Sequence, residues 1–162
     1  MNIMWAPWRA TYVTKEHTKE HDGPACVFCR LPAEDDDEGN YILDRGEFCY
    51  VIMNLYPYNN GHLMVVPYEH TDTLTGLDQE TLNEMMGALS RWQVILADAM
   101  RPQGFNVGIN QGSAAGAGIA EHLHMHLVPR WVGDTNFMPV LGDARVMPQH
   151  LDETYQLLKI EE

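Results

Sequence analysis

Residues 122–129 read His-Leu-His-Met-His-Leu-Val-Pro, in which histidine alternates strictly with apolar residues. This period of two predicts a half-buried strand over His122–Val128, because successive side chains of a strand point to opposite faces. His122, His124 and His126 are then expected on one face, about 6.5–7 Å apart at ~3.3 Å per residue. The intervening leucine and methionine side chains point to the other face, into the core. The stretch therefore predicts a sheet strand that carries a row of three imidazoles.

The neighbours of this row favour phosphate chemistry. Upstream, residues 111–118 are rich in Gly, Ala and Ser, so their backbone N–H groups can approach an anion closely. Downstream, Arg130 offers a cation for phosphate, with pairing to Glu121 as the alternative. A neutral imidazole is a good nucleophile toward phosphorus, and neighbouring rings can donate to the phosphate oxygens.

Two other interpretations of the row stay open. Histidines at i and i+2 also suit a metal site, in which the strand would hold a transition ion directly. The row can also face solvent without a role, but a half-buried strand does not need three identical titratable rings. Metal binding, for its part, does not need the small-residue loop upstream.

Other segments predict the remaining elements. Asp78 is a candidate N-cap for a helix of roughly 22 residues, because apolar residues recur after it in steps of three and four. This helix ends at Pro102 and Gly104, and its Met and Trp stripe is expected in the core. Further strands are predicted at Tyr41–Asp44, Phe48–Met53, His62–Val66 and Phe105–Asn110, and a short final helix at Leu151–Ile160. One long helix packed on a mainly antiparallel sheet is an α+β fold.

The length predicts one domain, and the charge argues against nucleic acid and membranes as partners. The 162 residues suit a single domain, with 1–40 as a lead-in that carries a Cys pair, 41–131 as the core and 132–162 as a C-terminal tail. The formal net charge of -13 repels nucleic acid and anionic membranes, so we expect neither as a partner. No apolar stretch approaches the ~20 residues of a membrane helix. A cytoplasmic location is therefore expected.

The three cysteines point to a metal or redox motif. Their odd number argues against a disulfide framework. Cys26 and Cys29 have the two-residue spacing of half a zinc knuckle, but a zinc site needs four ligands. Cys49, inside a predicted strand, is most simply a small core residue.

The chain resembles the histidine triad (HIT) family of nucleotidyl hydrolases and transferases. Residues 122–129 fit the family pattern of His-x-His-x-His followed by apolar residues. Residues 61–70 look like the family's upstream strand with its own histidine, and residues 110–113 look like the Asn-x-Gly segment before the triad. The resemblance covers the chain from about Cys26 to Trp131. It implies the histidine triad fold and a homodimer with the long helix and a sheet edge in the interface.

Within the family, the chain looks like the branch of diadenosine tetraphosphate phosphorylases and related hydrolases. The segments that carry this likeness are Trp5–Arg9 and Pro129–Met138 with the tail. Members of the short phosphoramidase branch have Gln or Ser close before the triad, where this chain has Gly118–Glu121. The resemblance implies a dinucleoside polyphosphate substrate and phosphorolysis. The alternatives are an adenosine phosphoramidase-type enzyme, an asymmetric nucleotide hydrolase, and a non-catalytic metal- or nucleotide-binding module.

The resemblance also implies a role for individual residues. His124 would attack the α-phosphorus and form a nucleotidyl-histidine, while His126 and His62 would hold the phosphate and help the leaving group. Asn54 stands at a ribose-contacting position, with a role only in the turn before Pro57 as the alternative. The full set of expected substrate contacts is Asn54, Asn110, Gln111, Ser113 and Arg130.

The resemblance completes the candidate zinc site as well. Some family members close it with a histidine after the upstream strand and with the first histidine of the triad, which here are His70 and His122. With Cys26 and Cys29 these give a Cys₂His₂ site that would pin the N-terminal segment to the sheet. The alternative is a pair of buried thiols, with His122 hydrogen-bonded rather than ligated.

Overall fold

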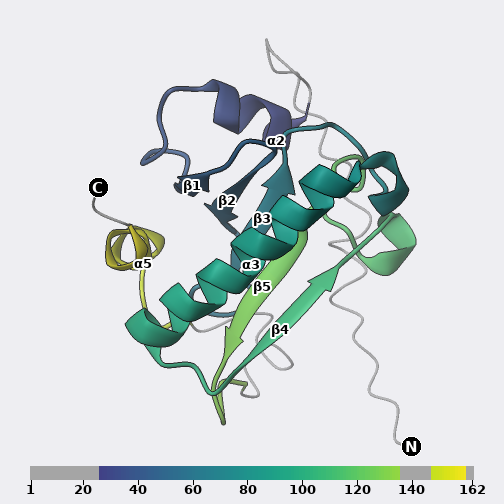
Figure 1. Cartoon of the computed structure of the whole chain (residues 1–162). Helices are drawn as coiled ribbons and strands as arrows, with labels where there is room; N and C mark the ends of the chain where they lie inside the picture. Colours follow the sequence, from purple (N-terminus) through teal and green to yellow (C-terminus); the bar gives the residue numbers. More distant parts are fainter. Residues whose placement is uncertain (1–25, 136–146, 160–162) are drawn as a thin grey trace, which may run out of the picture.

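Five strands form one open sheet in the order β1-β2-β3-β5-β4, and each neighbouring pair is antiparallel. Figure 1 shows the computed structural model of the chain, in which residues 26–135 and 147–159 are described. The strands are β1 (Ile42–Arg45), β2 (Cys49–Met53), β3 (Leu63–Pro67), β4 (Gly104–Ile109) and β5 (Met125–Arg130). The predicted mainly antiparallel sheet of an α+β fold is confirmed. The branch-bearing residues 5–9 and 136–138 lie outside the described residues.

Helix α3 (Gln79–Met100) begins and ends where the sequence predicts. The Asp78 carboxylate accepts a hydrogen bond from the Thr81 N–H at 2.8 Å, which satisfies one of the donors at the helix start. Arg101 ends the helix in the left-handed conformation, with φ at 50°. The shorter helices are α2 (Val27–Arg30) and α5 (Leu151–Leu158), with 3-10 turns at Leu31–Ala33, Leu74–Gly76 and Ser113–Ala115. None of the described helices is both long and apolar enough to cross a membrane.

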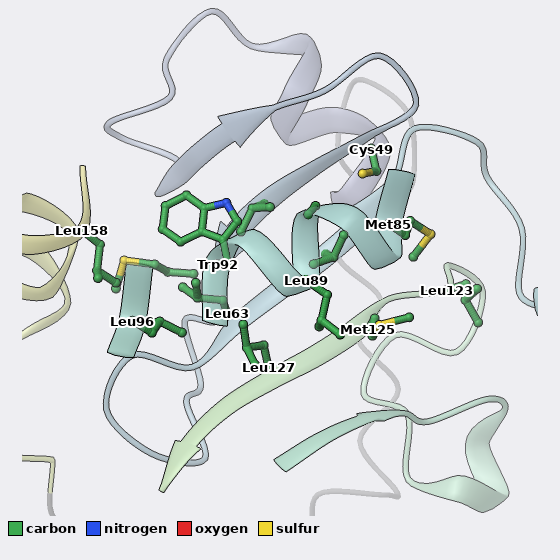
Figure 2. Packing of buried hydrophobic residues seen from close by; sticks show 14 of the residues in the cluster. Cys49, Leu63, Met85, Leu89, Trp92, Leu96, Leu123, Met125, Leu127 and Leu158 are labelled. Carbon is green, nitrogen blue, oxygen red and sulfur yellow. The ribbon is translucent and has the colours of Figure 1, made fainter. Parts of the chain in front are cut away.

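The main core lies between α3 and one face of the sheet. In Figure 2 the side chains of Met85, Leu89, Trp92 and Leu96 face the sheet, where β3 and β5 contribute leucines to the same cluster. Leu158 of α5 joins this cluster from the side. The predicted core stripe of α3 is confirmed for these residues. It is wrong for Met86, which is 54% exposed, and for Ala99, because these lie on the outer side of the helix.

The opposite face of the sheet is only partly covered in the described residues. Helix α2 and its flanks pack there on the β1–β3 half, where Phe28, Tyr50 and Ile52 belong to a second apolar cluster. Over the β4 half, by contrast, Asn106 and Gly108 are exposed. The histidines of the predicted row lie on this second face, next to the exposed half.

The histidine strand is shorter than predicted. β5 begins at Met125, because the registers with β3 and β4 both start at that residue. His122–His124 precede the paired region, and there the Leu123 N–H donates to the Thr71 carbonyl at 2.6 Å. The alternation still holds, since Leu123 packs in the core under α3. All three histidines are buried, so a solvent-facing row is wrong.

Candidate active site and metal cluster

His62 and His126 form a hydrogen-bonded pair of rings. The Tyr58 backbone N–H donates to His62 Nδ1 at 3.0 Å, and since an N–H can only donate, the proton of the neutral His62 ring is on Nε2. His62 Nε2 then donates to His126 Nδ1 at 2.9 Å, which places the His126 proton on Nε2. Among the described residues, His126 Nε2 is the one buried side-chain N or O atom without a partner. Such an unpaired donor in a folded protein marks a place where a ligand can be recognised.

His124 has the opposite tautomer. Its Nδ1 lies 2.8 Å from the carbonyl oxygen of His122, and a carbonyl only accepts, so Nδ1 carries the proton and the lone pair is on Nε2. The ring centroid is 5.0 Å from that of Phe28 and 4.8 Å from that of His126. The described residues therefore set a ring with a nucleophilic nitrogen directly beside a ring that presents a donor.

His122 turns its lone pair toward the cysteines. Its Nε2 lies 2.9 Å from the Pro67 carbonyl and must donate to it, so Nδ1 is unprotonated. That Nδ1 is 3.3 Å from Cys26 Sγ, 3.5 Å from Cys29 Sγ and 3.3 Å from His70 Nδ1. His70 Nδ1 is also 3.3 Å from Cys29 Sγ. The structure thus brings all four predicted metal ligands together.

These distances fit a tetrahedral zinc site. With Zn–N of about 2.0–2.1 Å and Zn–S of about 2.3 Å, neighbouring ligand atoms of a tetrahedron lie about 3.3–3.8 Å apart. The four ligand atoms all lie within 4.8 Å of one another. The hydrogen bond from His122 to Pro67 is the kind of outer contact that orients a metal-ligating imidazole. The cluster could therefore hold a metal ion, and in the described residues it takes His122 but neither His124 nor His126.

Burial lowers the pKa of all three triad histidines and so favours their neutral form. For His126, burial and secondarily the nearby His124 lower the pKa to about 4. Burial is also the main cause that lowers the pKa of His122 and of His124. In the metal cluster, burial and then the neighbouring Cys26 raise the pKa of the Cys29 thiol to about 11. A metal ion bound there would have to displace that proton.

Two of the predicted substrate contacts lie close to the histidines. Asn54 accepts from the Tyr56 N–H at 2.9 Å, and its amide nitrogen lies 3.4 Å from His62 Nδ1, so it shapes the turn and faces the histidine pair. Ile109, the last residue of β4, pairs with Met125, which lies between His124 and His126, and Asn110 directly follows the end of this register. Gln111 and Ser113 follow on the exposed loop, where Gln111 accepts from the Leu74 N–H at 3.5 Å.

Glycine keeps the sheet open beside His126. Gly108 is paired directly with His126 across the strands, so a side chain at position 108 would lie on the same face of the sheet as the His126 ring. A Cβ at Gly108 would meet nothing within 4 Å, which leaves open space at that point. A ligand can therefore approach the histidine pair over β4.

Arg130 is already paired within the fold. Its Nε lies 2.7 Å and its NH2 2.8 Å from the two carboxylate oxygens of Asp134, and NH1 donates to Asn106 Oδ1. This pairing replaces the alternative with Glu121. The Arg130 ion pair also lowers the pKa of Asp134 to about 2. The nearby acid four residues downstream was a signal in the sequence for this pair.

The sequence indicates Tyr58 as a candidate lining residue of an adenine slot, with ordinary packing near the turn as the favoured alternative, and the structure places it against the histidine pair. Its backbone fixes the His62 tautomer, and its ring centroid lies 4.6 Å from that of His62 and 5.4 Å from that of His126. The contact with the histidine rings was not predicted, because it depends on how the loop folds back over the sheet. Its ring is part of the wall around the histidine pair.

Comparisons with known proteins agree with this geometry. The model of the HIT domain matches residues 39–132. A protein of Mycobacterium tuberculosis named AP-4-A phosphorylase is 41% identical over 162 residues, which cover 98% of this chain and 83% of that protein. The crystal structure of a Zn-bound histidine triad family protein from Mycobacterium smegmatis is 30% identical, with a TM-score of 0.67 over 83% of this chain and 91% of that one.

A second solved structure supports the same assignment. It is a hypothetical histidine triad nucleotide-binding protein from Sulfolobus tokodaii, 27% identical, with a TM-score of 0.64 over 82% of this chain and 86% of that one. The family model alone spans more than half of the 162 residues. The chain therefore belongs to the HIT family, the histidine triad family of nucleotidyl hydrolases and transferases that its sequence resembles.

Proposed function

We propose that this protein is a phosphorylase of dinucleoside polyphosphates that works through a nucleotidyl-His124 intermediate. One observation carries the proposal: the lone pair of His124 is on Nε2, and the adjacent ring is that of His126, whose Nε2–H has no partner among the described residues. A nucleophilic nitrogen next to a fixed donor suits attack on a phosphorus atom whose oxygens gain charge in the transition state. The likeness to the AP-4-A phosphorylase of M. tuberculosis supports the substrate class and the acceptor.

The first step transfers a nucleotidyl group to the enzyme. His124 Nε2 attacks the α-phosphorus of diadenosine tetraphosphate, an N–P bond forms, and the P–O bond to the leaving ATP breaks with its electron pair on that oxygen. The His122 carbonyl accepts from Nδ1–H throughout and stabilises the positive charge that develops on the ring. His126 Nε2–H donates to the phosphate oxygens, and His62 holds His126 in the tautomer that can do so.

The second step releases the nucleotide. An oxygen of inorganic phosphate attacks the same phosphorus, the N–P bond breaks, and its electron pair returns to His124 Nε2. The products of the whole reaction are then ATP and ADP. We place Asn54 at the ribose, and Asn110, Gln111 and Ser113 at the phosphates. Arg130 is left out of the proposed contacts, because Asp134 holds its guanidinium.

Product analysis tests this proposal. With diadenosine tetraphosphate and labelled inorganic phosphate, we expect equal amounts of ATP and ADP, with the label in the β-phosphoryl group of ADP. Without phosphate, turnover should stop after about one nucleotide per active site. AMP and ATP formed at the same rate with and without phosphate would contradict phosphorolysis, although not nucleotidyl transfer. A complete lack of products would contradict both.

We also propose that Cys26, Cys29, His70 and His122 hold a structural zinc ion. Support comes from the tetrahedral spacing of their ligand atoms and from the Zn-bound relative of M. smegmatis. Bound there, zinc would cross-link helix α2 to the start of the histidine segment. Within the chain, the Pro67 carbonyl orients the His122 ring so that its Nδ1 faces the thiols.

We further propose a homodimer in which β4 meets the same strand of a second copy. β4 is the last strand of the sheet, and its Val107 is 46% exposed. An exposed edge strand of this kind is a ready site for pairing with another chain. Sedimentation equilibrium should give twice the mass of the 18.4 kDa chain, and Val107→Asp should shift it toward one chain. A monomer at micromolar concentration would contradict the dimer.

A further inference from the structure

We propose that Thr154 and Gln149 act as positioning residues for catalysis, because they hold Asn60 and through it set the place of His62. The proposal deepens the proposed function, since His62 acts there through His126. Gln149 and Thr154 belong to the C-terminal segment 147–159, whose helix α5 lies beside the C-terminal end of α3 in Figure 1. In sequence they are 89 and 94 residues from Asn60.

Both hydrogen-bonding ends of the Asn60 amide are engaged by this segment. Asn60 is only 7% exposed. Its Nδ2 donates to Gln149 Oε1 at 2.6 Å, and its Oδ1 accepts from Thr154 Oγ1 at 3.2 Å. The Thr154 hydroxyl hydrogen is shared with the His150 carbonyl, which lies 3.1 Å away. A buried amide that loses a partner pays a desolvation cost, so Asn60 is expected to stay in this one orientation.

Asn60 lies inside the tight turn that presents His62. The turn is closed by a hydrogen bond from the His62 N–H to the Asn59 carbonyl at 3.2 Å. Gly61 has φ at +70°, and a Cβ there would stand 2.7 Å from Met100 Sδ. The turn is thus confined from the side of α3, and Asn60 is its anchor to the C-terminal segment.

The neighbouring Asn59 anchors the other side of the same turn. Its Nδ2 lies 3.1 Å from the Pro129 carbonyl and 2.7 Å from Asp134 Oδ2. The turn is therefore suspended between the end of β5 and the C-terminal segment. If only one anchor remained, the His62 ring could shift relative to β5, which carries His126.

A small shift of His62 would change the chemistry that His126 offers. While His62 donates to His126 Nδ1, the His126 proton must be on Nε2, where it faces the substrate as a donor. Without this bond His126 can take the other tautomer, in which Nε2 has a lone pair that repels phosphate oxygens. The C-terminal segment therefore controls whether the site presents a donor or an acceptor.

The turn and the C-terminal segment are not closely packed everywhere. A cavity of about 240 Å³ lies between the turn and the C-terminal segment, with Met53 and Pro57 on one side and Leu151 on the other. Apolar contacts are lost across a cavity, so the two hydrogen bonds of Asn60 are a specific link between the turn and the C-terminal segment.

The experiment compares Thr154→Val with two matched variants of the full chain. Thr154→Val has nearly the same shape but no hydroxyl, and we expect kcat to fall about tenfold with KM within about twofold. Thr154→Ser keeps the hydroxyl and should restore kcat to within about twofold. Tyr155→Phe removes the bond from the next α5 residue to the Ile42 carbonyl, 3.1 Å long, and should lower stability without lowering kcat.

Ring ¹⁵N chemical shifts give a readout that does not depend on turnover. In the wild type and in Tyr155→Phe we expect His62 and His126 each as one tautomer with the proton on Nε2, and in Thr154→Val a mixture at His126. Wild-type shifts and kcat in Thr154→Val, or the same changes in Tyr155→Phe, would overturn the proposal. If the wild type does not turn over any dinucleoside polyphosphate, the proposed function fails, while the tautomers still decide the positioning role.

Discussion

His124→Ala is expected to lower nucleotidyl transfer from a dinucleoside polyphosphate by about 10⁴–10⁶-fold in kcat, the scale seen when a nucleophile is removed. The reason is that the hydrogen bond from Nδ1–H to the His122 carbonyl leaves the lone pair of His124 on Nε2, in a ring adjacent to that of His126. Initial rates with and without inorganic phosphate measure the effect. Rapid quenching and mass spectrometry should show a nucleotidyl adduct on the wild type and none on the variant.

A second variant separates chemistry from packing. Removal of the ring also removes its contact with Phe28, so His124→Ala could act through the fold. In His124→Asn the amide nitrogen can still donate to the His122 carbonyl, but Nε2 is gone. We expect the same loss of turnover with an unchanged circular dichroism spectrum. Asp98→Ala, at an exposed position of α3, is the control and should keep the wild-type rate. More than about 1% of wild-type turnover in His124→Asn would rule out this nucleophile.

Loss of the metal cluster is expected to lower the free energy of unfolding by several kilocalories per mole. A ligand that binds only the folded state stabilises it by about 4 kcal/mol when its free concentration is 1,000 times its dissociation constant. We therefore expect Cys26→Ser to lower the unfolding free energy by about this amount in zinc-containing buffer and to lose the bound zinc. Chemical denaturation with and without a chelator, together with elemental analysis, measures both effects.

Cys49→Ser is the matched control for this experiment. Cys49 is a buried cysteine outside the cluster, and its thiol donates to Glu84 Oε1 at 3.4 Å. Its variant should keep one zinc per chain and keep its response to the chelator, whereas Cys26→Ser should show no response. Turnover per folded molecule should survive chelation, because the His124 tautomer depends on a backbone carbonyl. Equal zinc content in Cys26→Ser and the wild type would contradict the assigned ligands.

Local patterns in the sequence were enough for the main elements. Helix α3 was predictable because its period of apolar residues and the Asp78 cap are both local signals. The alternation of residues 122–127 placed the histidines on one face, and Leu123 and Leu127 on the other. The start of β5 at Met125 was not predictable in this way, because it depends on where its partner strands end.

Contacts that join distant segments could not be predicted from the pattern. The tautomers follow from backbone groups of Tyr58, Pro67 and His122, whose positions depend on the complete fold. The link between Asn60 and Thr154 spans 94 residues and has no local signature. The prediction of a single domain over the whole chain, its cytoplasmic location and the roles of the individual site residues stay predictions.

His122 contributes its side chain to the cysteine cluster and its backbone to the orientation of His124. Its imidazole belongs to the cysteine cluster, whereas its contribution to His124 comes from the peptide oxygen, which every amino acid possesses. Substitution at this position can therefore erase metal affinity while it spares the geometry of the nucleophile. In an enzyme built this way, the metal ligands could be replaced by apolar residues during evolution, and the catalytic histidine would keep its hydrogen bond to the backbone.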